Sequence, residues 1–158
     1  MKAPLHSFPR VEPLSGNIDL DGVLAIEEAT FNNPTTRAWY EAELGRPDVC
    51  KVFVVRTKDR PVAGFVAFWR VLDEMHINNL AVHPELRGQG LGRRLLREAL
   101  AAAHHMGIRR ATLEVRRSNA TALHLYERAG FTVAAVRPNY YSHPVEDALV
   151  LAAAVESA

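Results

Sequence analysis

The segment Arg87-Gly-Gln-Gly-Leu-Gly-Arg93 is the part of the chain best suited to binding an anion. It follows an apolar stretch, Leu80 to Val82, and leads into a run with apolar residues at helical spacing. Gly88, Gly90 and Gly92 lack a Cβ atom, so backbone N–H groups of this loop can approach a phosphate closely. The following helix adds the positive end of its dipole. The segment is therefore predicted to hold a phosphate or pyrophosphate group.

Two widespread phosphate-binding loops do not fit this segment. A dinucleotide fingerprint has the spacing G-x-G-x-x-G, whereas the glycines here are spaced G-x-G-x-G. A nucleoside-triphosphate loop needs Gly-Lys-Ser or Gly-Lys-Thr, and the chain has neither. The remaining pattern, R-x-x-G-x-G from Arg87 to Gly92, resembles the acetyl-CoA signature of the GNAT acyltransferase superfamily. A glycine-rich turn that only begins a helix is the alternative.

A second segment, Leu113 to Phe131, carries an acid, an amide and a phenol around one strand-to-helix turn. Glu114 lies near the end of an expected strand, Asn119 begins a helix, and Tyr126 follows two turns later. All three side chains could therefore face one cleft beside the glycine loop.

The same segment carries a close family resemblance. Leu-Glu-Val-Arg-x-Ser-Asn-x-x-Ala-x-x-Leu-Tyr-x-x-x-Gly-Phe begins at Leu113, and Arg137-x-Asn139-Tyr140-Tyr141 and Glu146-Asp147-Ala148 follow it. Together these motifs resemble the ribosomal-protein-alanine N-acetyltransferase (RimI) family. The similarity spans roughly Asp73 to Leu151, about half the chain, with its separated blocks in the expected order.

The resemblance implies a role for each matching residue. Glu114 would accept a proton, Tyr126 would donate one, and Asn119 would contact the cofactor. The acetyl-CoA site would comprise the strand residues Leu80, Ala81 and Val82, along the pantetheine arm, and the loop residues Arg87, Gly88, Gln89, Gly90, Leu91, Gly92 and Arg93, at the pyrophosphate. We further expect Tyr140 and Tyr141 to form a wall of the slot that binds the acceptor peptide.

These roles agree with the chemistry of acetyl transfer. An N-terminal α-amine has a pKa of about 7.7 to 8.0, so a carboxylate has one proton to remove before the amine can attack a thioester. Backbone N–H groups from Leu80 to Val82 are the nearest candidates to stabilise charge on the carbonyl oxygen. Holding both substrates in one complex lowers the barrier through proximity, so that no covalent enzyme intermediate is needed.

Each of these residues also has a structural interpretation. Glu114 could be an ordinary exposed strand carboxylate, and Tyr126 could be a core aromatic with its hydroxyl at the rim. Asn119 could cap the helix, which is compatible with a cofactor contact. Tyr140 and Tyr141 could cover a sheet edge.

Length and composition limit the remaining classes. The chain has 158 residues, enough for one domain spanning 1–158, with 19 Lys plus Arg against 18 Asp plus Glu. This balance does not favour nucleic acid as a partner. The single Cys50 is expected in a strand rather than as a nucleophile, and neither it nor the seven histidines form a metal site, His83 being structural.

Targeting and assembly can also be estimated from the chain. Met1 to Arg10 has no apolar core of signal-peptide length, and no stretch has the roughly 18 apolar residues of a membrane span. We therefore expect a cytoplasmic protein without membrane contact, as a monomer or weak dimer, using acetyl-CoA as cosubstrate and no metal.

The order of the expected elements indicates a mixed α+β fold. Four helices and six strands are expected, the helices at 17–31, 35–44, 90–106 and 119–129 and the strands at 50–57, 62–72, 75–82, 110–116, 131–136 and 148–153. The resemblance implies a GNAT-like sheet, mixed but mostly antiparallel, splayed between its middle strands and flanked by about four helices.

The predicted function is acetyl transfer from acetyl-CoA to the N-terminal α-amine of a protein, with an alanine-starting ribosomal protein as the foremost acceptor. The loop 32–35, Asn-Asn-Pro-Thr, differs from the more aromatic Phe-Pro-Trp type of bacterial relatives, which leaves broader N-terminal specificity open. Other readings are a small-amine or lysine acetyltransferase and a non-catalytic acyl-CoA-binding sensor module. The Glu114 and Tyr126 pair argues against the sensor, since pure binding needs neither.

Overall fold

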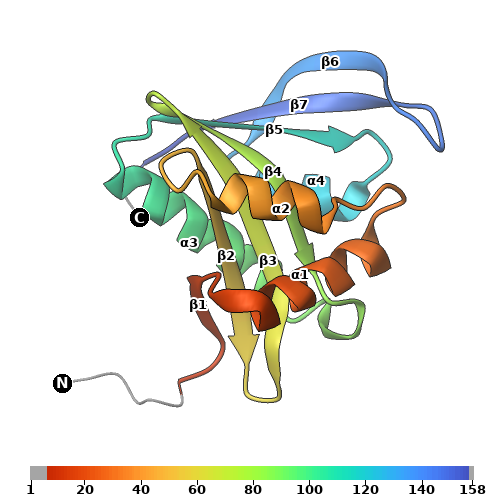
Figure 1. The fold of residues 1–158 in the computed structure, drawn as a ribbon. Helices are drawn as coiled ribbons and strands as arrows, with labels where there is room; N and C mark the ends of the chain where they lie inside the picture. Colours follow the sequence, from red (N-terminus) through yellow and green to blue (C-terminus); the bar gives the residue numbers. More distant parts are fainter. Residues whose placement is uncertain (1–6, 157–158) are drawn as a thin grey trace.

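The computed structural model describes residues 7–156, which form one seven-stranded sheet with four α-helices (Figure 1). The strand order in space is β1-β2-β3-β4-β5-β7-β6. The strands are β1 (Arg10–Pro13), β2 (Cys50–Thr57), β3 (Arg60–Val71), β4 (Glu74–Val82), β5 (Arg110–Arg116), β6 (Thr132–Tyr141) and β7 (Glu146–Ala154). The helices are α1 (Gly16–Thr30), α2 (Arg37–Leu44), α3 (Leu91–His105) and α4 (Ala120–Arg128), with a short 3₁₀ turn, η1 (Pro84–Leu86).

Two of the helices cover each face of the sheet. Figure 1 shows α1 and α2 on the near side and α3 and α4 behind. The core under α1 and α2 includes Ile26, Tyr40 and Phe65, and the core under α3 and α4 includes Leu95 and Leu113. Both cores exist because the central strands alternate apolar side chains between the two faces and bury both of them.

One pair of neighbouring strands differs from the rest of the sheet. All neighbours are antiparallel except β4 and β5, which are parallel because α3 carries the chain back between them. Their paired register begins at Glu74 and Arg110 and ends at Ile77 and Leu113. After Ile77, β4 has no ladder with β5, and it pairs with β3 alone from Asn79 to Val82. The expected mixed, mostly antiparallel sheet that opens between its middle strands is confirmed.

A bulge in β4 lies where the ladder ends. Phe68 of β3 pairs with Ile77 and Ala67 pairs with Asn79, so Asn78 is an extra residue in β4. Bulges bend a strand and increase its local twist. This bulge therefore accompanies the divergence of β4 from β5.

The sequence-based boundaries were wrong at both ends of the sheet. The strand β1 was missed, because it has four residues, lies at the edge and is recognisable only by its pairing with β2. The strand β6 was expected at 131–136 but continues to Tyr141, so that Tyr140 and Tyr141 end this strand rather than precede the next. Pro138 and Asn139 have turn-like character, and the chain accommodates them as an irregularity in which Asn139 has a φ of +53°.

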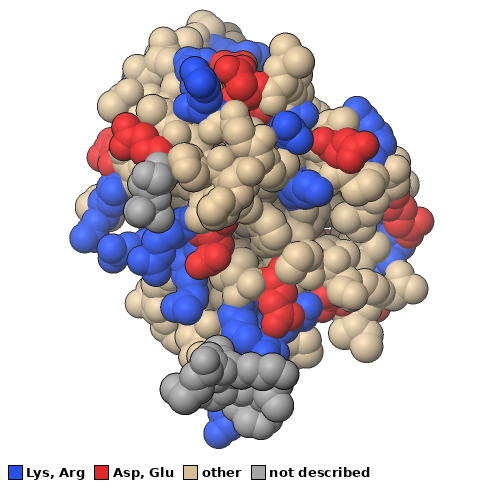
Figure 2. Space-filling view, turned by 90° about the vertical axis from the view of Figure 1, so that its left-hand side faces the viewer, with Lys and Arg blue, Asp and Glu red and all other residues tan. Residues whose placement is uncertain are grey.

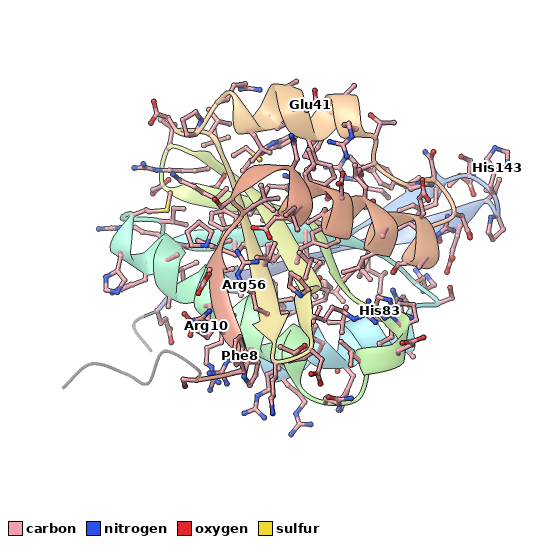
Figure 3. All side chains as sticks on the ribbon, turned by 60° about the horizontal axis from the view of Figure 1, so that its bottom comes forward. Phe8, Arg10, Glu41, Arg56, His83 and His143 are labelled. Carbon is pink, nitrogen blue, oxygen red and sulfur yellow. The ribbon has the colours of Figure 1, made fainter. Side chains whose placement is uncertain are left out.

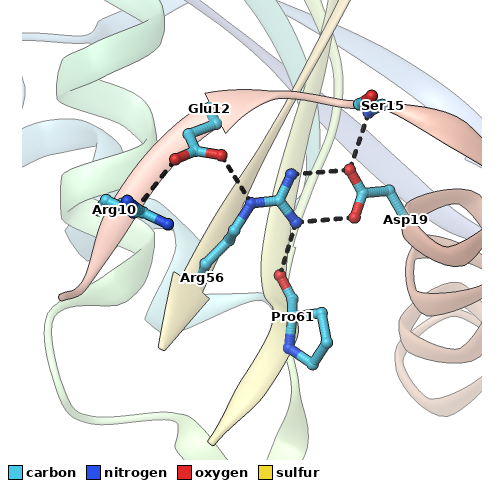
Figure 4. Close-up of polar contacts among 6 residues, drawn as sticks. All are labelled: Arg10, Glu12, Ser15, Asp19, Arg56 and Pro61. Carbon is cyan, nitrogen blue, oxygen red and sulfur yellow. Dashed lines mark hydrogen bonds and ion pairs between the residues drawn. The ribbon is translucent and has the colours of Figure 1, made fainter. Parts of the chain in front are cut away.

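An ion-pair network fixes the start of α1 against the sheet (Figure 4). The guanidinium of Arg56 in β2 contacts both carboxylate oxygens of Asp19, at 2.7 and 2.8 Å, and an oxygen of Glu12 at 2.8 Å. Asp19 is buried, and its hydrogen bonds with Arg56 hold its pKa below its usual range. Removing one partner of such a buried pair costs about 3–5 kcal/mol. The network therefore positions α1.

The surface carries both signs of charge. Figure 2, which shows the side of the molecule on which α3 and β1 lie, has Lys and Arg side chains interspersed with Asp and Glu. This mixture agrees with the net charge of +1. None of the helices in the described part of the chain combines the length and the apolar character needed to cross a lipid bilayer.

Candidate active site

The glycine loop between η1 and α3 has the geometry of an anion site. Gly88 and Gly90 both have a φ of +82°, a left-handed conformation that side chains disfavour. No atom lies within 4 Å of the place where a Cβ would be at either residue. Gly90 is the N-cap of α3 and provides no side-chain cap, so the first N–H groups of this helix have no side-chain partner there. The loop and the helix N-terminus thus present main-chain donors outward.

The side chain of Arg87 anchors this loop through two hydrogen bonds. Its Nε donates to the carbonyl oxygen of Val82 at 3.1 Å, and an Nη donates to the hydroxyl of Thr30 at 2.9 Å. The side chain therefore ties the loop to the end of β4 and to the end of α1. Arg93 is exposed in the first turn of α3, and a phosphate contact from either arginine stays a prediction.

The end of β4 lies beside the glycine loop. Leu80, Ala81 and Val82 pair with β3 on one side and have no ladder on the other. A Cβ added to Gly92 would lie 3.7 Å from side-chain atoms of Leu80, Val82 and Leu125. The first turn of α3 therefore packs closely against both β4 and α4.

Glu114 lies in β5 one residue beyond the end of the ladder, on the sheet face that carries α1 and α2. Its neighbours Leu113 and Val115 belong to the core under α3 and α4, so the strand alternation turns Glu114 the other way. Its Oε2 lies 2.5 Å from Nε2 of His76, and its Oε1 lies 3.8 Å from an Nη of Arg137. The hydrogen bond with His76 is the main reason that the pKa of Glu114 is below its usual range. This side chain is therefore an ionised carboxylate at neutral pH.

Tyr126 lies in α4 and is buried in the core under α3 and α4. Its ring packs edge-on against Phe131, with the ring centres 5.6 Å apart. Burial raises the pKa of Tyr126 above that of a free phenol, and the charge that Tyr141 would carry adds to the shift. The phenol therefore keeps its proton at neutral pH. Glu114 and Tyr126 therefore lie on opposite faces of the sheet, and the structure does not bring them to one face as the sequence predicted.

The remaining predicted site residues have structural contacts of their own. Asn119 is the N-cap of α4, and its side chain accepts from the N–H of Ala122 at 3.1 Å. Tyr140 and Tyr141 meet edge-on with ring centres 5.0 Å apart, and the guanidinium of Arg116 lies 4.5 Å from the Tyr141 ring centre. Burial raises the pKa of Tyr141 to about 12. The site roles of all three residues stay predictions.

The connection between α1 and α2 closes the other side of the site. A hollow of about 410 Å³ is lined by residues 33–36, Trp39, Asn78 and Asn79. The side chain of Asn32 donates to the carbonyl oxygen of His143 at 3.0 Å, which joins this connection to the β6–β7 hairpin. Figure 3 shows His143 at the tip of that hairpin, far from His83 beside the glycine loop.

A buried carboxylate holds the same connection onto the sheet. Glu27 of α1 accepts from the hydroxyl of Tyr40 at 2.9 Å, from the side-chain amide of Asn79 at 2.7 Å and from the N–H of Thr35 at 2.9 Å. Burial raises the pKa of Glu27. This one side chain thus joins α1 to α2, to β4 and to the α1–α2 connection.

Sequence reasoning missed two residues beside Glu114, namely His76 and Asn78. His76 Nδ1 lies 3.0 Å from Oδ1 of Asn78, and the Nδ2 atom of Asn78 is buried without a hydrogen-bond partner. A signal for both was present, since β4, α3 and β5 form a β-α-β unit whose strands lie parallel and adjacent. That arrangement brings the polar face of β4 next to Glu114.

Two other expectations concern reactive side chains and metals. Cys50 is buried in β2, and burial raises the pKa of its thiol to about 11, so the strand interpretation holds and a thiolate nucleophile does not. His83 accepts from the N–H of Glu85 at 3.2 Å and caps η1, which is a structural role. Among residues 7–156, no group of three or more His, Cys, Asp or Glu side chains is placed to hold a metal ion.

This geometry agrees with a family comparison. Residues 20–131 match the profile of a family described as "Acetyltransferase (GNAT) family". The chain belongs to the GNAT acetyltransferase family. It is an N-acetyltransferase, and enzymes of this GNAT family take the acetyl group from acetyl-CoA.

Two individual relatives show which members of the GNAT family this chain is similar to. A Bacillus subtilis (strain 168) protein, provisionally named a ribosomal protein bS18-alanine N-acetyltransferase, is 38% identical over 133 residues, which cover 84% of this chain and 87% of that protein. The Escherichia coli (strain K12) enzyme named ribosomal protein bS18-alanine N-acetyltransferase is 42% identical over 98 residues, 61% of this chain and 66% of that one.

Solved structures of the same GNAT fold show the same similarity. The crystal structure of the ribosomal-protein-S18-alanine N-acetyltransferase from Escherichia coli superposes with a TM-score of 0.85 at 32% identity, over 96% of each chain. Ard1 from Thermoplasma volcanium superposes with a TM-score of 0.81 at 26% identity, over 94% of this chain and 98% of that one. The resemblance to the ribosomal-protein-alanine N-acetyltransferases is thereby confirmed.

The residues of this GNAT chain also fit the cofactor of the family. The diphosphate of acetyl-CoA needs closely approaching N–H donors, which the left-handed glycines and the uncapped start of α3 supply. An extended pantetheine arm needs a strand with free backbone groups, and β4 has such an edge after Ile77.

Proposed function

We propose that the chain transfers an acetyl group from acetyl-CoA to the N-terminal α-amine of a protein, with an alanine-starting ribosomal protein as its foremost acceptor. The observation that supports this most is the opening of the β4–β5 ladder after Ile77 and Leu113. Glu114 lies next to that opening, and the glycine loop lies at the end of the same strand. A thioester and an amine could therefore meet beside a carboxylate.

On the cofactor side, defined as Leu80–Val82 together with Arg87–Arg93, the main chain does the binding. N–H groups at Gly88 to Arg93 would hold the diphosphate, with Gln89 and Leu91 contributing through their backbone. The free edge of Leu80 to Val82 would pair with the pantetheine arm. When bound, acetyl-CoA supplies an activated acetyl group as a thioester.

On the acceptor side, defined as residues 32–36 with Glu114, Tyr140 and Tyr141, side chains do the binding. The hollow beneath residues 33–36 would receive the first residues of the acceptor, and Tyr140 and Tyr141 would form its other wall. Both walls are joined by the bond between Asn32 and His143. The acceptor would thus enter between the α1–α2 connection and the β6–β7 hairpin.

Glu114 would accept the proton of the acceptor ammonium, and Tyr126 would protonate the departing thiolate. Tyr126 is suited to this step because it keeps its proton at neutral pH. Glu114 is ionised and free to accept, although its ordinary pKa of about 4.3 lies more than three units below that of an α-amine. Placing the proton on this carboxylate alone costs about 5 kcal/mol at the ordinary values. Proximity of amine and thioester in one ternary complex offsets much of such a cost.

The test is incubation with acetyl-CoA and a peptide that begins with alanine. The proposal predicts release of a free thiol together with a mass gain on the peptide N-terminus. A matched peptide with a blocked N-terminus and an internal lysine should not react. Binding of acetyl-CoA without turnover would instead support the sensor interpretation, and reaction of the blocked peptide would support lysine acetylation.

Broader N-terminal specificity is the second candidate. Residues 32–35 are Asn-Asn-Pro-Thr, and the three of them that line the hollow, residues 33–35, are not aromatic. An acceptor pocket without an aromatic clamp at this loop would discriminate less between first residues. A library of peptides with free N-termini distinguishes the two, because strict specificity predicts one preferred sequence. We place the enzyme in the cytoplasm, as a monomer or weak dimer.

A further inference from the structure

His76 and Glu114 are joined more closely than a carboxylate base acting alone would require. His76 of β4 pairs with Thr112, and Glu114 of β5 lies one residue past the last pair, so their side chains meet at the end of the β4–β5 ladder. The Nε2 atom of His76 lies 2.5 Å from Oε2 of Glu114. A hydrogen bond at this separation needs one proton between the two atoms.

Both ring nitrogens of His76 have a partner. Nδ1 faces Oδ1 of Asn78 at 3.0 Å, and Nε2 faces Glu114. Both partner atoms are oxygens that accept, and only the imidazolium carries N–H groups at both ring positions. The structure therefore has the arrangement of a histidine that holds an extra proton.

The charged groups around the ring explain how this proton is held. Glu114 faces the ring from β5 and raises the pKa of His76, whereas Arg137 from β6 and burial lower it. The ring of Trp69, from β3, lies 6.0 Å from the imidazole centre and carries no charge. The carboxylate of Glu114 is the largest of these influences, so the two groups titrate as a pair.

The two side chains differ in exposure to solvent, and the more exposed one is His76, which would release the proton. The side chain of His76 is 32% exposed and that of Glu114 is 15% exposed. An acceptor seated over Glu114 would cover it further, while His76 keeps its own contact with solvent. The ring can therefore return a proton to water while the carboxylate is covered.

We propose that His76 and Glu114 form a proton-accepting dyad, in which His76 takes up the proton that Glu114 removes from the acceptor amine. This inference rests on the proposed function, since it assigns the route of the proton in that reaction. Asn78 orients the ring by accepting from Nδ1, which leaves Nε2 to face the carboxylate. Glu114 touches the amine, and His76 is a positioning residue that acts through it.

The proton balance of the reaction follows from these positions. At rest His76 is the imidazolium, and it first releases its Nε2 proton to solvent, which leaves a neutral ring with its hydrogen on Nδ1 and a lone pair on Nε2. The ammonium gives one proton to Glu114, and the Nε2 lone pair takes it up, which restores the carboxylate and forms the imidazolium. The amine nitrogen then forms the N–C bond while the C–S bond breaks, its electron pair leaving with sulfur.

Two further protons are then accounted for. Tyr126 gives its proton to the thiolate, and the surplus proton on the new amide nitrogen restores the phenol. The imidazolium formed at His76 is again the resting form, so the proton released to solvent at the start is the one that is lost. One proton leaves per acetyl group transferred, as the overall reaction of an ammonium with a thioester requires.

The test compares H76Q with H105Q, which makes the same change at an exposed histidine at the end of α3. The dyad predicts that H76Q lowers kcat at pH 7 by about tenfold and changes the pH profile of kcat/KM for an alanine-starting peptide. Since the amine titrates identically in both variants, the difference between their profiles isolates His76. The KM for acetyl-CoA should stay within about twofold of the wild type. Melting temperatures confirm that both variants are folded.

A titration by proton NMR gives a second readout that does not need turnover. The imidazole signal of His76 should titrate above the ordinary histidine range, and E114Q should move it back towards that range. Wild-type turnover with identical pH profiles in H76Q and H105Q would overturn the dyad and leave the proposed function standing. Absence of wild-type turnover would overturn the proposed function and the proton route together.

Discussion

The proposed cofactor side of the site is made of backbone, and the proposed acceptor side is made of side chains. At the glycine loop, the decisive features are left-handed φ angles, an uncapped helix start and a strand edge without a partner. Around Glu114, the decisive features are contacts between side chains from β4, β5 and β6. Main-chain groups bind any ligand of the same shape, whereas side chains determine which acceptor and which protonation state the site accepts.

The largest effect is expected at Tyr126, the proposed acid for the departing thiolate. Y126F removes only the hydroxyl, and the ring keeps its packing against Phe131. We expect kcat to fall by about a hundredfold, the lower end of what general acid catalysis contributes. Affinity for acetyl-CoA, measured by calorimetry, should stay close to that of the wild type. An unchanged kcat would remove Tyr126 from the chemistry and leave the acid unassigned.

The second-largest effect is expected for E114Q, a change on the acceptor side alone, and its size should depend on pH. Glu114 has a lowered pKa, so it is ionised throughout the neutral range and its loss matters wherever the acceptor amine is protonated. We expect E114Q to reduce kcat/KM by about thirtyfold at pH 7 and by less than about threefold at pH 9, where the α-amine is mostly neutral.

A matched control for Glu114 is E127Q, an exposed glutamate of α4. This variant should show the wild-type profile at every pH. If E114Q lost the same factor at pH 7 and pH 9, Glu114 would be binding the acceptor rather than accepting its proton.

A smaller effect is expected at Gly90, where a substitution should weaken CoA binding by the cofactor side. In G90A the added Cβ meets no atom, but a φ of +82° costs an alanine about 1–2 kcal/mol. We expect the loop to relax away from this angle and the Kd for CoA to rise about tenfold. Calorimetry on G107A gives the comparison, because Gly107 has a φ of +80° at the other end of α3.

Both glycine variants should lose similar amounts of stability, since the same strain is introduced at each. Only G90A should weaken CoA binding. Equal Kd values for the two variants would mean that the glycine loop is a structural turn and not the diphosphate site.

The smallest effect is expected at the rim of the acceptor side. N32A removes the bond to the carbonyl oxygen of His143, which is exposed and contributes about 0.5–1 kcal/mol. We expect the KM for the peptide to rise about two- to threefold and the KM for acetyl-CoA to stay constant. N17A, an exposed asparagine at the start of α1, serves as the reference. A change in both KM values would show that the α1–α2 connection also supports the cofactor.

The contrast between local backbone features and contacts between distant side chains also explains which parts of the site could be predicted from the sequence. The glycine spacing and the helix cap are local, so the turn at Gly88 to Gly92 and the cap at Asn119 were identified from neighbouring residues. The family motif added the opening in the sheet. The positions of Glu114 and Tyr126 in β5 and α4 also followed from short-range patterns.

The contacts that determine the acceptor side could not be read in this way. His76 and Glu114 are 38 residues apart, and Asn32 and His143 are 111 apart, so nothing local links them. The bulge at Asn78 depends on the register between β3 and β4. Strand β6 passes through Pro138 and Asn139, residues typical of turns, because pairing with β7 overrides their local preference.

The most direct test of the account is an amide ¹⁵N–¹H NMR spectrum recorded as CoA is added. We expect the N–H signals of Gly88 to Arg93 to shift most, together with those of Leu80 to Val82, because these main-chain groups bind the diphosphate and the pantetheine arm. Saturable binding of CoA that leaves these signals unmoved, or no binding at all, would contradict it.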